Sequence, residues 1–151
     1  VKTDFLQNGI RLTKTRFETH QITFNFRDCP DLAQTVIVTA AGLGIQGLFT
    51  GLETLKIKET DRINALKTEL EKLGATIEIT KHGGLKLISG VKREKDSVCI
   101  STYNDHRMAM AFAPLSLVCS NLQIEDPEVV KKSYPNYWTN LGEAGFIVSK
   151  T

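Results

Sequence analysis

The sequence predicts an α/β (α+β) fold made of about two copies of a β-α-β-α-β-β unit, roughly residues 1–88 and 89–151. Short stretches of alternating apolar and polar residues indicate strands, and longer stretches with apolar residues three or four apart indicate helices. These stretches follow one another twice in the same order. Equivalent residues recur with them, about 74 residues apart for Asp31/Asp105 and Lys58/Lys132 and about 71 for Gly74/Gly145.

The first copy contains the clearer periodicity. Strands are expected near 9–13, 21–26, 46–49 and 52–57, followed by a hairpin of 76–80 and 85–88. Residues 31–43 are apolar nearly all round, which predicts a helix buried on several sides. A second helix begins after Thr60, its expected N-cap, and ends at Gly74. Its apolar face is formed by residues at helical spacing, namely Ile63, Leu66, Leu70 and Leu73.

The second copy repeats this order with shorter elements. Strands are expected at 98–100, 122–124 and 146–148. A mostly apolar helix is expected over 108–118, kinked or shortened by Pro114. A turn is expected over 126–132. Ser133 is then expected to cap a last helix that runs through Glu143 and stops at Gly145.

Composition places the chain among ordinary globular domains. It has 151 residues, 41% hydrophobic and 24% charged, with a net charge of +2. The longest apolar run is too short and too broken to cross a membrane, and the net charge is too weak to argue for nucleic acid. The three cysteines fit no zinc spacing and no disulfide framework. We therefore expect a cytoplasmic chain with no metal, cofactor, membrane or nucleic-acid partner.

Four polar clusters stand where a strand or turn meets a helix. They are Asp28/Asp31, Lys58/Glu59/Asp61/Arg62, Asn104/Asp105/His106/Arg107 and Lys131/Lys132. Ligands of α/β sheets collect at such junctions, and the repeat lets the four clusters converge on one face. Arg62 and Arg107, each in a first helical turn, suit a bidentate grip on phosphate or carboxylate. The alternative is a set of solvated ion pairs without function.

Two of these stretches carry a family resemblance. KETDRI at 58–63 and YNDHRMAMAF at 103–112 are similar to signature stretches of the 5-enolpyruvylshikimate-3-phosphate synthases. The segments 28–31 and 126–135 resemble two further family segments. The resemblance covers almost the whole chain but only about the last third of a family member. It implies that residues 1–151 are part of the C-terminal domain of the enolpyruvyl transferase fold, with the N-terminal domain absent.

The resemblance also implies a reaction and a role for individual residues. The family transfers the enolpyruvyl group of phosphoenolpyruvate to the 5-hydroxyl of shikimate 3-phosphate and releases phosphate, on the way to chorismate and aromatic amino acids. Asp31 would take the hydroxyl proton and Glu59 would handle the proton at the methylene carbon. Lys58 and Thr54, together with Asp31, would bind shikimate 3-phosphate. Phosphoenolpyruvate would be bound by Arg62, His106, Arg107 and Lys132.

The resemblance has departures and leaves alternatives. Many relatives have Asn and Arg where this chain has Thr54 and Lys56. The cations that the family's other half supplies are missing, so the partner of this chain is expected to be the N-terminal part of the same enzyme, and the fragment alone is expected to be inactive. One alternative is a UDP-N-acetylglucosamine enolpyruvyl transferase relative, against which the 103–112 stretch argues. Another is an RNA-binding module of similar plan, against which an aromatic content of 7% argues.

Overall fold

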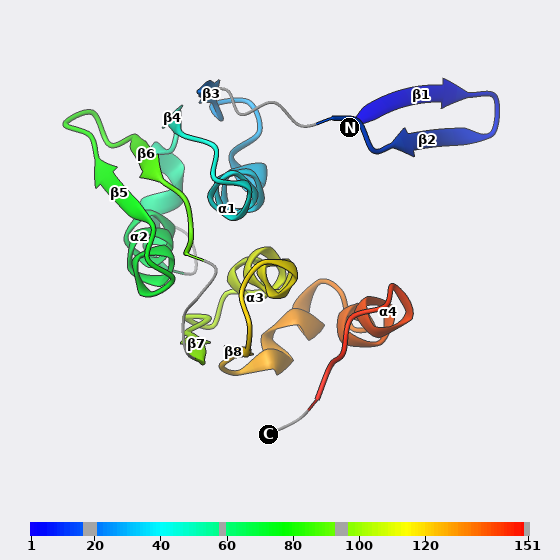
Figure 1. Ribbon diagram of the computed structural model, residues 1–151. Helices are drawn as coiled ribbons and strands as arrows, with labels where there is room; N and C mark the ends of the chain where they lie inside the picture. Colours follow the sequence, from blue (N-terminus) through cyan, green and yellow to red (C-terminus); the bar gives the residue numbers. More distant parts are fainter. Residues whose placement is uncertain (17–20, 58–59, 93–96, 150–151) are drawn as a thin grey trace.

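The first unit is built around two parallel strands joined by a helix. The computed structural model describes residues 1–16, 21–57, 60–92 and 97–149 (Figure 1). Strands β3 (Ile22–Asn25) and β4 (Gly47–Thr50) are parallel, and the 3₁₀ helix η1 (Pro30–Leu32) and helix α1 (Ala33–Leu43) connect them. Gly44 ends α1 in the left-handed conformation, with a φ of 72°, that glycine adopts without strain.

The rest of the first unit completes a four-stranded sheet. The 3₁₀ helix η2 (Glu53–Ile57) leads towards helix α2 (Arg62–Lys72), and strands β5 (Thr76–Ile79) and β6 (Leu85–Ser89) form an antiparallel hairpin. Strand β6 also pairs antiparallel with β4, so the strand order is β3-β4-β6-β5. The first unit therefore has the predicted β-α-β-α-β-β order.

The second unit repeats the first half of this arrangement. Strands β7 (Val98–Ile100) and β8 (Leu122–Ile124) are parallel. The segment between them forms helix α3 (His106–Phe112) and the 3₁₀ helix η3 (Ala113–Leu117). The 3₁₀ helix η4 (Pro127–Lys132) and helix α4 (Tyr137–Glu143) follow β8. The α-helix ends before Pro114, as the sequence predicts, because proline cannot donate the next helical hydrogen bond.

Several predicted elements are wrong in the structure. The strand expected at 146–148 is not formed, because no neighbouring described strand pairs with its backbone, and Ile147 is 99% exposed. The segment expected to be a strand at 52–57 forms the 3₁₀ helix η2 instead. Leu55 in η2 and Leu52 directly before it, three residues apart, are both fully buried. The turn expected at 126–132 is the 3₁₀ helix η4.

Two predicted helix caps are also wrong. The N-cap of α2 is Asp61 rather than Thr60, and its carboxylate accepts hydrogen bonds from the amides of Ile63 and Asn64, each at 3.2 Å. Helix α4 begins at Tyr137, after Asn136, and not at Ser133. The residues that precede it belong to η4 and a short turn. The glycine stops at Gly74 and Gly145 are confirmed, both with positive φ.

One hydrophobic core joins the two units. Figure 1 shows α1 and α2 against the four-stranded sheet, with α3 on the opposite side of α1. Buried residues of one cluster come from α1, α2, β6, β7 and α3, including Ile37, Leu66, Leu87, Ile100 and Met108. The packing holds the first turns of α1, α2 and α3 together, and this is where the polar clusters lie.

A hairpin at the start of the chain stands apart from this core. Strand β1 (Lys2–Leu6) pairs antiparallel with β2 (Gly9–Thr13), and the hairpin extends away from the other elements (Figure 1). Its apolar side chains are open to solvent, with Phe5 85% and Leu12 63% exposed. Among the described residues, no helix has both the length and the apolar character needed to span a membrane.

Candidate active site

A buried ion pair lies at the centre of the polar clusters. The Arg62 Nε atom donates to Asp105 Oδ2 at 2.6 Å, and Arg62 Nη2 donates to Asp105 Oδ1 at 3.3 Å. The side chains of Arg62 and Asp105 are 1% and 0% exposed. Gln34 of α1 adds a weaker hydrogen bond from Nε2 to Asp105 Oδ2, at 3.5 Å. Because two charges buried from water need close partners, this pair fixes the start of α2 against the start of α3.

Asp31 links this buried pair to the surface. The Asp31 Oδ1 atom lies 3.6 Å from Arg62 Nη1, and Asp31 Oδ2 lies 2.9 Å from Arg107 Nη2. Arg107 Nη1 also donates to the backbone carbonyl of Asp31 at 3.1 Å. The Asp31 side chain is 50% exposed and that of Arg107 is 32% exposed. A carboxylate open to solvent is thus held between two guanidinium groups.

Local helix chemistry explains why these side chains meet. Asp105 is the N-cap of α3, and its Oδ1 accepts the Arg107 amide at 2.9 Å. Arg62 is the first residue of α2, and Asp31 lies in η1 directly before α1. The three helices therefore present their positive ends to one region, where a bound anion is favoured.

Lys132 lies beside the same turn. Its Nζ donates to Asn104 O at 3.2 Å and to Asn104 Oδ1 at 3.1 Å. Because Asn104 precedes Asp105, these bonds bring the ammonium group of η4 to the start of α3. His106 is half-buried as the first residue of α3, and its Nδ1 is buried without a hydrogen-bond partner in the described part of the chain.

The structure brings together most, but not all, of the predicted site residues. Asp31 contacts both Arg62 and Arg107, and Lys132 is hydrogen-bonded to Asn104 at the start of α3. Thr54 is exposed in η2 and makes none of these contacts. Lys58 and Glu59 lie outside the described residues. The predicted convergence on one face thus holds for the contacts that the structure describes, while the role of each residue stays a prediction.

The sequence did not predict the buried contacts that two acidic residues make in this region. Asp105, a member of one of the four polar clusters, is the N-cap of α3, and it also holds Arg62. Glu69 is fully buried and accepts hydrogen bonds from Tyr103 and Ser101. The helical spacing could have predicted this burial, because Glu69 follows Leu66 by three residues and so lies on the buried face of α2.

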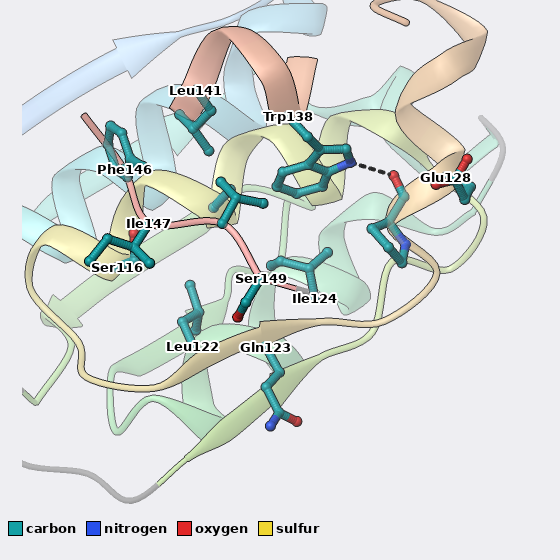
Figure 2. Close-up of a pocket in the computed structure, with 13 residues that line it drawn as sticks. Ser116, Leu122, Gln123, Ile124, Glu128, Trp138, Leu141, Phe146, Ile147 and Ser149 are labelled. Atoms are coloured by element: carbon teal, nitrogen blue, oxygen red, sulfur yellow. Dashed lines mark hydrogen bonds between the residues drawn. The ribbon is translucent and has the colours of Figure 1, made fainter. Parts of the chain in front are cut away.

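A cavity of about 390 Å³ lies away from this cluster, between α4, β8 and residues 146–149 (Figure 2). Its lining is mainly apolar and includes Ile124, Trp138 and Leu141. The Trp138 indole donates its hydrogen bond to the Pro127 carbonyl at 2.8 Å. In the first unit, β4 and α2 correspond to β8 and α4 of the second unit. There the β5–β6 hairpin lies beside them, because β6 pairs with β4 and β5 contacts α2. The cavity lies in the unit whose described residues form no such hairpin. Its described lining has one charged residue, Glu128, which pairs with Lys131, and no cation that could bind a phosphate.

The charged cluster offers a defined chemistry. The half-exposed Asp31 carboxylate can accept a proton from a hydroxyl group, and the neighbouring cations can bind a phosphate or carboxylate. No group of three His, Cys, Asp or Glu side chains within the described ranges is arranged to hold a metal ion. We therefore take this cluster, and not the cavity, as the candidate site.

Comparisons with known proteins agree on one family. The family model described as EPSP synthase (3-phosphoshikimate 1-carboxyvinyltransferase) matches residues 6–141. The 3-phosphoshikimate 1-carboxyvinyltransferase of Bacteroides fragilis (strain YCH46) is 48% identical over 147 residues, which are 97% of this chain and 36% of that protein. That of Clostridium novyi (strain NT) is 37% identical and covers 88% of this chain and 30% of the relative.

A solved structure gives the same result. The EPSP synthase of Acinetobacter baumannii, determined at 2.37 Å, superposes with a TM-score of 0.66 and 28% identity, over 77% of this chain and 27% of that one. This chain spans about a third of the length of the curated relatives that it matches. The resemblance seen in the 58–63 and 103–112 stretches is confirmed, as is the mixed α/β fold: the chain belongs to the EPSP synthase family.

Proposed function

We propose that this chain is the C-terminal part of an EPSP synthase. The complete enzyme would transfer the enolpyruvyl group of phosphoenolpyruvate to the 5-hydroxyl of shikimate 3-phosphate and release phosphate, in the cytoplasmic pathway to chorismate and aromatic amino acids. The observation that carries the proposal is the contact of Asp31 with both Arg62 and Arg107 at the junction of three helix starts. Family membership supports it independently.

Asp31 is the proposed base for the attacking hydroxyl. Its carboxylate is half exposed, so a substrate can reach it, and two guanidinium groups fix its position. As the hydroxyl oxygen bonds to the enolpyruvyl carbon, its proton would pass to Asp31. Glu59 would deliver the proton to the methylene carbon, and Lys58 and Thr54 would help to bind shikimate 3-phosphate. Return of a proton from the resulting methyl group to Glu59, together with expulsion of phosphate, would then restore the carbon–carbon double bond.

Four basic side chains are proposed to bind phosphoenolpyruvate. Arg107 and Lys132 reach the open side of the cluster, where a dianionic phosphate can approach. His106 stands beside Arg107 at the start of α3. Arg62 is engaged with Asp105 through Nε and Nη2, so its contact with the substrate would be made by the edge that faces Asp31.

The remaining part of the enzyme is the proposed partner of this chain. Residues 1–88 and 89–151 would be two units of the C-terminal domain, and the missing part would supply the other cations and close over the substrates. The match covers 36% of the Bacteroides protein, so the unmatched part of that relative is nearly twice as long as the matched part. This further chain would cover the open apolar surfaces, which are the β1–β2 hairpin and the cavity beside β8. We therefore expect no turnover from residues 1–151 alone.

The test is an anion titration of ¹⁵N-labelled 1–151, followed by NMR with inorganic phosphate and with phosphoenolpyruvate. We expect weak binding that shifts the amides at the starts of α1 and α3. Lys132→Ala is expected to weaken this binding, whereas Lys131→Ala is the matched control, because Lys131 pairs with Glu128 instead. Arg107→Ala is expected to abolish the binding.

Three results would contradict the proposal. Equal phosphate affinity in the parent, Lys132→Ala and Arg107→Ala would reject the site. Phosphate release by purified 1–151 from phosphoenolpyruvate and shikimate 3-phosphate would overturn the claim that the missing part is required. Salt-sensitive binding of single-stranded RNA without any response to phosphate would favour an RNA-binding module.

A further inference from the structure

A buried carboxylate ties α2 to the turn that precedes α3. Glu69 is 0% exposed, and its Oε2 accepts hydrogen bonds from the Ser101 amide at 3.0 Å and from Lys72 Nζ at 2.6 Å. Its Oε1 accepts the Tyr103 hydroxyl at 2.7 Å. Burial and the neighbouring Glu69 carboxylate raise the pKa of Tyr103 from 10.0 to about 12, so the hydroxyl remains a donor well into the alkaline range. Both oxygens of Glu69 are thus used.

The turn held in this way has an unusual backbone. Tyr103 and Asn104 both adopt the left-handed conformation, with φ of 54° and 57°. Such a conformation costs a residue other than glycine free energy, and two in succession persist only where surrounding contacts hold them. Glu69 contacts the first half of this turn, at Ser101 and Tyr103.

The second half of the turn carries the contacts of the candidate site. Asn104 accepts two hydrogen bonds from Lys132, and Asp105 holds Arg62 and accepts the Arg107 amide. A change in the conformation of the turn would therefore move the partners of the Lys132 and Arg62 side chains and of the Arg107 amide together.

We propose that Glu69 and Tyr103 are positioning residues of this active site. The Glu69 carboxylate fixes the left-handed turn through the Tyr103 hydroxyl and the Ser101 amide, and the turn in its fixed form places Asn104 against Lys132 and Asp105 against Arg62. This inference rests on the proposed function for the meaning of the site, but not for the geometry of the turn. Neither residue needs to touch a substrate.

The test compares Tyr103→Phe with Tyr137→Phe in the 1–151 chain. Tyr137 is a matched control because its hydroxyl also donates one hydrogen bond, to Met110 O at 3.0 Å, and its pKa is likewise raised to about 12, chiefly by burial. We expect both variants to lower the urea midpoint by similar amounts. Only Tyr103→Phe should accelerate hydrogen exchange of the Ser101 and Arg107 amides, while the amides of β5 and β6 stay unchanged.

Phosphate binding gives the second readout. Tyr103→Phe is expected to weaken phosphate affinity by about threefold to tenfold, and Tyr137→Phe to leave it unchanged. Glu69→Gln keeps the shape and one acceptor for Tyr103, so it should weaken binding less than Glu69→Ala does.

The two proposals fail in different ways. If the parent binds phosphate and Tyr103→Phe binds it equally well with unchanged exchange of the Ser101 and Arg107 amides, the positioning role is overturned and the proposed function stands. If the parent binds no phosphate, the anion site fails, and the exchange data alone then decide whether Glu69 holds the turn. Equal acceleration of exchange by Tyr137→Phe would also overturn the positioning role, because the effect would be global.

Discussion

Replacement of Asp105 by asparagine tests whether the buried pair with Arg62 holds the two units together. Asparagine has nearly the same size and is an equally good N-cap, so the cap of α3 should survive. The negative charge opposite Arg62 is lost, although the guanidinium remains 1% exposed. Breaking a buried ion pair by neutralising one partner lowers the free energy of unfolding by about 3–5 kcal/mol, since the other charge stays buried.

The structure places the expected loss at the lower end of this range. Asp31 Oδ1 lies 3.6 Å from Arg62 Nη1 and offsets part of the missing charge. We therefore expect Asp105→Asn to lower the free energy of unfolding by about 3 kcal/mol, measured by urea denaturation followed by circular dichroism. For a chain of this size, that loss corresponds to a fall in Tm of roughly 6–12 °C.

Two further variants decide whether the buried charge is the cause. Asp61→Asn is the matched control, because Asp61 also caps a helix but pairs with no buried cation among the described residues. It should change the free energy of unfolding by less than about 0.5 kcal/mol. Arg62→Met combined with Asp105→Asn should be more stable than Asp105→Asn alone, since no unpaired charge remains. A loss below about 1 kcal/mol in Asp105→Asn, or no recovery in the double variant, would refute the reasoning.

Three further predictions concern the site and its surroundings. Asp31→Ala should raise the phosphate affinity of 1–151 by about threefold to tenfold, because it removes the carboxylate that occupies the guanidinium groups; weaker binding in the NMR titration would show that Asp31 supports the anion. Gly51→Ala should cost about 2–4 kcal/mol in urea denaturation, because the φ of Gly51 is 69° and a Cβ would lie 2.2 Å from Asn25 Oδ1; a loss below about 1 kcal/mol would contradict this. The folded-state pKa values of Tyr103 and Tyr137 are raised from 10.0 to about 12, so their contribution to stability is complete below pH 10 and is lost as pH rises towards 12. Fluorescence-monitored urea midpoints from pH 9 to 12 should therefore fall less steeply when both are replaced by Phe, and parallel curves would argue against the shifts.

The parts of the fold that sequence could predict are those with a local cause. The apolar face of Ile63, Leu66 and Leu70 predicted α2, and all three residues are fully buried. Pro114 predicted the end of α3 because the effect of proline acts on its own turn. The strand at 146–148 could not be judged in the same way. Its alternation of apolar and polar residues is adequate, but a strand forms only with a partner, and none of the described strands pairs with it.

The same division applies to the candidate site. Helix-start arginines and the repeat predicted that Arg62 and Arg107 would approach each other, and both contact Asp31. Sequence did not predict that Asp105 would engage Arg62, because that contact depends on how α3 docks on α2 across 43 residues of chain. The partners of a buried charge are set by tertiary packing rather than by local spacing.

The Arg62–Asp105 pair also has a consequence for how the molecule assembles. Its two groups are 43 residues apart, and the Arg107–Asp31 contact spans 76. An intermediate with α2 packed but α3 undocked would lack the Asp105 partner of the Arg62 guanidinium, so it should be sparsely populated. Acquisition of anion affinity would then coincide with the last, cooperative step of folding. Nascent or misassembled chains would remain unable to sequester metabolites.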